Sequence, residues 1–161
     1  MSTRKIRVGI VAGGQSSEHE ISCISAGAVL KAIDRELFDP VLIGITKSGQ
    51  WVTPNPDQQL AIVDGVLPEI LDGEEKLIEE ALDDVDLLFP ILHGPYGEDG
   101  TFQGLCEMLG VRYVGSGVLA SAVGMDKSFA KPIFAAHGLG VAPGIVVTSA
   151  EGIDTSSLTF P

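Results

Sequence analysis

The chain has 161 residues, 45% of them apolar, which is enough for a globular domain with its own core. Its 22 acidic and 10 basic residues give a formal charge of −12, which argues against binding to nucleic acid or to an anionic membrane surface. The sequence shows no signal region before its first apolar segment and no apolar run of membrane-spanning length, so we expect a cytoplasmic protein.

The first third of the chain predicts a βαβ unit. Residues 6–12 are β-branched and almost all apolar, as in a parallel strand covered on both faces. A glycine-rich turn follows, and then a helix to about residue 35, with Ser17 as its N-cap and Glu20 as the reciprocal partner of a capping box. A second strand falls within residues 38–46, so the crossover between the strands should be right-handed.

The middle of the chain predicts more alternating strands and helices. Residues 47–52 indicate a turn and a short extra strand, and 53–72 a proline-interrupted loop. A short acidic helix, a buried strand over 85–92, a helix to about 109 and a short strand over 110–114 follow in that order. We therefore predict an α/β fold, a Rossmann-like, mostly parallel sheet flanked by helices.

Residues after 117 are expected to start a second α+β domain, so the predicted domains are 1–117 and 118–161. The helical pattern over 118–137 has a break near Asp126, which can cap a new helix. A strand is predicted over 141–148. Because the chain stops on an apolar residue and a proline, we also expect it to be part of a larger protein.

The stretch 93–104 follows a buried strand and holds four glycines, a histidine and two adjacent acids. Open α/β folds build their ligand sites at such carboxyl ends of strands. His93 can hydrogen-bond a carboxylate ligand or hold the loop through a backbone bond. Glu98 and Asp99 can act as an acid pair or metal ligands, but capping of the next helix by Asp99 is the favoured interpretation.

Two other charged residues stand near predicted helix starts. Glu18 follows the first glycine-rich turn, where it would repel a phosphate and attract an ammonium group, or simply complement the helix dipole. Lys127 opposes the dipole of its helix, which suggests an anionic ligand such as nucleotide phosphate; an exposed, solvated lysine is the alternative.

Three motifs together resemble the D-alanine–D-alanine ligases of the ATP-grasp superfamily. The segments 13–22 and 93–104 look like that family's two signatures, the second of them highly specific. The segments 113–117 and 125–127 are similar to its lead into the central domain. The resemblance covers essentially the whole chain and identifies residues 1–117 as a pre-ATP-grasp domain.

The resemblance implies an enzyme that joins two D-alanines with ATP and Mg²⁺ through an acyl phosphate, for peptidoglycan synthesis. It implies that Glu18, the expected catalytic residue, contacts the ammonium of the first D-alanine, with His93 beside the same substrate. It also implies that Lys127 reaches the ATP phosphates and that the family is commonly homodimeric through this amino-terminal part. The Mg²⁺ ligands are expected beyond residue 161, so these residues alone should not turn over.

Two other functions remain open from the sequence. One is a different ATP-grasp carboxylate–amine ligase, which would share the sheet but not the second signature. The other is a stand-alone Rossmann-like module that binds a small ligand without phosphate chemistry.

Overall fold

Strand β1 (Ile6–Gly13) is the centre of the fold in the computed structural model, which describes residues 4–55, 58–71, 73–149, 151–156 and 158. It pairs in parallel with β2 (Phe38–Ile45) and with β5 (Leu87–Pro90). Two short strands, β3 (Trp51–Thr53) and β4 (Glu74–Glu75), continue the sheet antiparallel, in the order β4-β3-β2-β1-β5. The predicted α/β class is confirmed, with an antiparallel edge.

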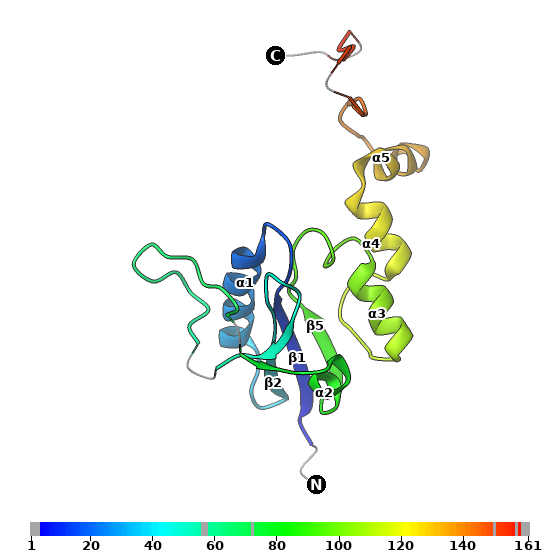
Figure 1. Cartoon of the computed structure of the whole chain (residues 1–161). Helices are drawn as coiled ribbons and strands as arrows, with labels where there is room; N and C mark the ends of the chain where they lie inside the picture. The colour runs from blue at the N-terminus through cyan, green and yellow to red at the C-terminus, as the bar shows by residue number, and fades with distance from the viewer. Residues whose placement is uncertain (1–3, 56–57, 72, 150, 157, 159–161) are drawn as a thin grey trace.

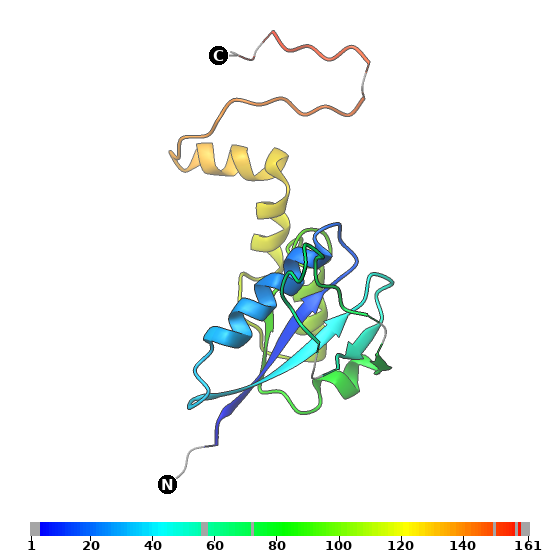
Figure 2. The same ribbon diagram turned by 90° about the vertical axis from the view of Figure 1, so that its left-hand side faces the viewer.

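Helices cover both faces of β1. Helix α1 (His19–Ala32) packs on one face and α3 (Thr101–Leu109) lies on the other (Figures 1 and 2). Ile10 belongs to the core on the α1 side, whereas the adjacent Val11 belongs to the core on the α3 side, and both are fully buried. This two-sided burial is why the strand is apolar almost throughout.

Two predicted elements in the middle of the chain are smaller than expected. The acidic stretch after residue 72 forms β4 and only a short helix, α2 (Ile78–Leu82). Residues 110–114 make a single parallel bridge, Leu88 to Tyr113, and no strand. The bridge lies beside β5, but the ladder does not extend beyond it, so the expected strand does not form.

The last helices are α4 (Val118–Met125) and α5 (Lys127–Ala136), and they extend away from the sheet together with the chain that follows (Figures 1 and 2). Asp126 separates them and accepts a hydrogen bond from the Ser128 amide at 2.8 Å, which confirms the predicted break and cap. The predicted strand over 141–148 is wrong, because none of the described residues 141–149 is in a strand. An isolated β-branched run has no ladder to join.

Candidate functional site

A crevice opens where the chain leaves β1 and β5 toward opposite faces of the sheet. After β1 the chain enters α1, and after β5 it enters α3 on the other side (Figure 1). Ligands bind open α/β sheets at such points, at the carboxyl ends of the strands. Two loops border the crevice: residues 14–18, called here the first loop, and residues 91–100, the second loop.

Serine hydroxyls join the two loops. Ser16 Oγ donates to the carbonyl of His93 at 2.7 Å and accepts from the Glu18 amide at 3.1 Å. Ser22 Oγ, which is buried in α1, donates to the Ile91 carbonyl at 2.6 Å and accepts from the Gly13 amide at 2.8 Å. The relative position of the loops is therefore fixed by bonds to α1 and to each other.

Glu18 is the N-cap residue of α1, with an exposed side chain that makes no capping hydrogen bond. Its carboxylate lies against the second loop, because a Cβ placed on Gly94 would come within 2.7 Å of Glu18 Oε2. The predicted capping box is wrong: the helix begins at His19, one residue later than Ser17 requires. Glu20, its predicted partner, instead pairs with Lys47 at 2.6 Å.

His93 lies at the same edge of the sheet as Glu18. Its ring Nε2 is 3.1 Å from Ser25 Oγ on α1, and its carbonyl accepts from Ser16. The ring is half-buried. The structure thus brings the two loops that carry Glu18 and His93 together, and leaves the Glu18 carboxylate open to solvent.

The adjacent acids of the second loop hydrogen-bond their own loop. Glu98 Oε2 accepts from the Gly94 amide at 2.7 Å. Asp99 accepts from the amides of Tyr96 and Thr101 at 2.9 and 3.0 Å, so it binds the first amide of α3 although Gly100 is the N-cap residue. Partial burial raises the pKa of Asp99, but these amide hydrogen bonds outweigh it and leave the pKa below its usual range. The acids act as loop structure, as the favoured interpretation expected.

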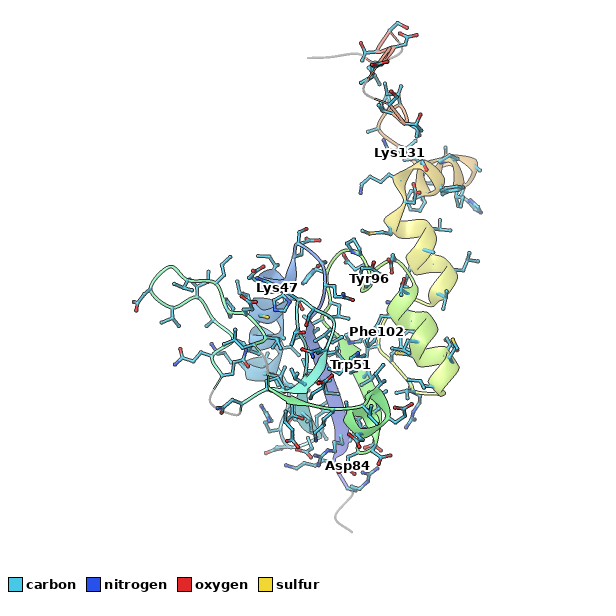
Figure 3. The ribbon with its side chains drawn as sticks, in the orientation of Figure 1. Lys47, Trp51, Asp84, Tyr96, Phe102 and Lys131 are labelled. Atoms are coloured by element: carbon cyan, nitrogen blue, oxygen red, sulfur yellow. The ribbon has the colours of Figure 1, made fainter. Side chains whose placement is uncertain are left out.

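A cavity of about 280 Å³, called here the crevice cavity, lies between the loops. Its lining includes His93, Gly14 and three aromatic side chains, Trp51, Tyr96 and Phe102. The rings of Trp51 and Phe102 are stacked, with centroids 6.2 Å apart and planes 12° apart (Figure 3). The cavity is of a size for a small ligand with an apolar part.

Lys127 lies elsewhere, in the first turn of α5. It lines a separate cavity of about 400 Å³ with Lys131 and residues 141–146. Lys131 Nζ donates to the Ala142 carbonyl at 3.0 Å and lies far from Trp51 and Tyr96 (Figure 3). The described part of the chain therefore does not bring Lys127 to the crevice.

The described residues contain no group of three or more histidine, cysteine or acidic side chains that could hold a metal ion. Among them, no helix is both long and apolar enough to cross a membrane.

Sequence reasoning missed two residues of α1 that shape the site, His19 and Ser22. Both are completely buried, and both bond to backbone groups of the loops. They share the buried face of α1 with Cys23 and Ala26. Polar residues at helical spacing on an apolar face were the signal that could have found them.

The fold and the crevice define a doubly wound α/β domain with a cavity at its switch point, where such folds bind ligands. The chain belongs to the family described as "D-ala D-ala ligase N-terminus", whose model matches residues 7–116.

Similar proteins carry ligase names. A D-alanine–D-alanine ligase from Corynebacterium aurimucosum is 48% identical over 166 residues, covering 94% of this chain and 46% of that protein. The crystal structure of VanG D-Ala:D-Ser ligase from Enterococcus faecalis is 31% identical with a TM-score of 0.67, covering 87% of this chain and 44% of that one. The crystal structure of the Bacillus anthracis D-alanine–D-alanine ligase complexed with ATP is 27% identical with a TM-score of 0.67. The match covers 96% of this chain and 42% of that one. This chain thus spans under half the length of these relatives.

Proposed function

We propose that the chain is the amino-terminal part of an ATP-dependent ligase that joins two D-alanines for peptidoglycan synthesis. One observation carries the proposal: the loop with Glu18 and the loop with His93 are bonded together at one edge of the crevice. The family membership and the names of the relatives support it. Because ATP is available in the cytoplasm, we propose that the enzyme acts there.

In the proposed reaction, Glu18 receives the ammonium group of the first D-alanine. A carboxylate attracts an ammonium group, and the Glu18 carboxylate is exposed beside the crevice. His93, held by Ser25, lies beside the same substrate and orients it. The substrate carboxylate then attacks the γ-phosphate of ATP, and ADP leaves as the acyl phosphate forms. The amine of the second D-alanine attacks the acyl carbon, loses a proton and displaces phosphate.

ATP is proposed to bind with its phosphates toward Lys127, which would have to lie closer to the crevice than in this structure for the γ-phosphate to reach the first D-alanine. The lysine stands at the start of a ten-residue helix, where the helix dipole also favours an anion. Mg²⁺ would neutralise the phosphate charge, and we propose that its ligands lie beyond residue 161, in the part of the ligase that the relatives have in addition to this chain. We also propose a domain boundary at 117/118, supported by a family match that ends at 116 and a helix that begins at Val118.

The test is phosphate release by a polypeptide of the relatives' full length that carries residues 1–161 as its amino-terminal part. We expect release to require both ATP and D-alanine, and residues 1–161 alone to release none. Light scattering would test the proposed homodimer, which would form through this amino-terminal part. An unaltered full-length enzyme that releases no phosphate with D-alanine would contradict the proposal.

A stand-alone binding module is the second candidate, because the crevice cavity is lined entirely by residues up to Leu105. It predicts D-alanine binding without any ATP-dependent turnover. The D-Ala:D-Ser name of the VanG relative keeps the second amino acid open, so D-serine belongs in the same assay.

A further inference from the structure

A buried histidine at the first turn of α1 has no part in the proposed chemistry. The side chain of His19 is 0% exposed, and each ring nitrogen has a backbone partner. Nδ1 lies 2.7 Å from the Gly14 carbonyl oxygen, and Nε2 lies 3.0 Å from the Ile70 amide nitrogen. An amide N–H can only donate, so Nε2 accepts and Nδ1 carries the proton given to Gly14. The ring is held as one neutral tautomer.

The Gly14 carbonyl, which accepts the hydrogen bond from His19 Nδ1, belongs to the first loop. Gly14 lines the crevice cavity, and its amide donates to the Ile45 carbonyl at the end of β2, at 2.8 Å. Both backbone groups of Gly14 are thus bonded. A Cβ on Gly13 would come within 2.9 Å of His19 Cε1, so the turn also packs closely on the ring.

The hydrogen bond from the Ile70 amide brings a segment that is distant in sequence to the His19 ring. Ile70 is 1% exposed, and the neighbouring Glu69 pairs with Lys47 at 3.1 Å. Lys47 also pairs with Glu20, in the first turn of α1. The Ile70 amide therefore holds one ring nitrogen of His19, and the other ring nitrogen holds the Gly14 carbonyl of the first loop.

We propose that His19 is a positioning residue of the amino-acid site. Through the Gly14 carbonyl and the Ile70 amide it sets the place of the turn before α1, and so of the adjoining Glu18 carboxylate. The proposal rests on the proposed function, in which Glu18 receives the substrate ammonium. A charged group that is displaced by a small distance loses much of its hydrogen bond to a ligand.

The experiment uses the full-length enzyme with His19→Phe, which removes both ring bonds, and His19→Asn, whose amide can still donate to Gly14. We expect His19→Phe to raise the KM for the first D-alanine about tenfold, with kcat and the KM for ATP within about twofold. His19→Asn should recover most of the lost affinity. His137→Phe is the matched control, because His137 is an exposed histidine at the end of α5, and it should leave all three constants unchanged.

A double-mutant cycle separates positioning from general stability. In a Glu18→Gln background, His19→Phe should change the KM for D-alanine by less than about twofold, because the group it positions is already altered. A full tenfold effect in that background, or an unchanged KM in the single variant, would overturn the proposal. Phosphate release by the unaltered enzyme is measured first, so a failure of the proposed function is seen separately.

A measurement on the unaltered protein covers the case in which His19→Phe does not fold. Nitrogen-15 NMR of labelled histidine reports which ring nitrogen carries the proton. We expect a neutral His19 ring protonated at Nδ1, with a shift of its signals when D-alanine is added. A ring protonated at Nε2, or signals that do not respond to saturating D-alanine, would contradict the role.

Discussion

The carboxylate of Glu18 packs against the backbone of Gly94, although the two residues follow different strands of the sheet. A methyl group on Gly94 would lie 2.7 Å from Glu18 Oε2, closer than real contacts allow. Gly94 also has a positive φ of 70°, which side chains disfavour. The residue is therefore constrained by its conformation, and a methyl group there would also move the Glu18 carboxylate, which is the far end of an exposed side chain.

Gly94→Ala should lose stability and also weaken substrate binding. The positive φ costs about 1–2 kcal/mol for any L side chain, and the methyl group must in addition displace the Glu18 carboxylate. Gly65→Ala is the matched control, because its φ is 79° and no atom lies within 4 Å of its Cβ position. We expect both variants to lower Tm, but only Gly94→Ala to raise the KM for D-alanine. Equal KM values in the two variants would show that D-alanine binding does not depend on the position of the Glu18 carboxylate.

Glu18→Gln should weaken binding of the first D-alanine in the full-length enzyme. The variant keeps the shape of the side chain but removes a charged hydrogen bond, which is worth about 1.5–3 kcal/mol, or roughly a tenfold to hundredfold change in Kd. Isothermal titration with D-alanine measures it. Glu36→Gln, an exposed carboxylate after α1, serves as the control. An unchanged Kd would return Glu18 to a role in complementing the dipole of α1.

Asp86→Asn should reduce stability at neutral pH but not in acid. Asp86 accepts from the Arg7 amide at 2.7 Å and pairs with Arg4, and these contacts hold its pKa below its usual value near 3.8. A lowered pKa in the folded state contributes stability above pH 3.8, which is lost as the pH falls through the folded pKa. The difference in Tm between the unaltered protein and the Asp86→Asn variant should therefore become smaller below about pH 4.

Asp84→Asn supplies the comparison for this pH series. Asp84 is exposed and lies two residues away. Its substitution should leave Tm nearly unchanged at every pH. A difference between the Asp86 variant and the unaltered protein that stays constant into acid would show that the ion pair does not carry the effect.

Both cysteines should resist alkylation in the folded protein. Cys23 and Cys106 are free and almost completely buried, and desolvation raises the pKa of each thiol from 9.0 to about 11. A rise of two units in the pKa of a thiol reduces its thiolate fraction about 100-fold at a pH below the pKa. Mass spectrometry after iodoacetamide treatment should find no labelled thiol at pH 8 and two labelled thiols in denaturant. Rapid labelling of either thiol under native conditions would show that its helix opens.

The core of the fold could be predicted from the sequence because burial on both faces leaves a simple pattern. The runs that became β1, β2 and β5 are apolar almost throughout, and the ends of each strand lie within two residues of the expected bounds. The break at Asp126 was also predictable, since a capping aspartate acts over two residues. Glu18 and His93 were found because they stand beside glycine-rich turns at strand ends; their roles stay predictions.

Contacts between distant segments could not be predicted. The capping box failed because Glu20 finds Lys47, a partner 27 positions away, and Ser16 rather than Ser17 binds the helix start. The role of His19 depends on the amide of Ile70, which no local pattern identifies. The expected strand over 141–148 needs a neighbouring strand, and propensity alone does not supply one.

The outer edge of the sheet has a consequence for how the protein behaves at high concentration. Strand β4 is only two residues long, and both residues, Glu74 and Glu75, are exposed carboxylates. A longer apolar edge would offer free backbone groups to the sheet of another molecule. Two copies that approached through β4 would instead bring four negative charges together, so this edge disfavours aggregation by strand addition.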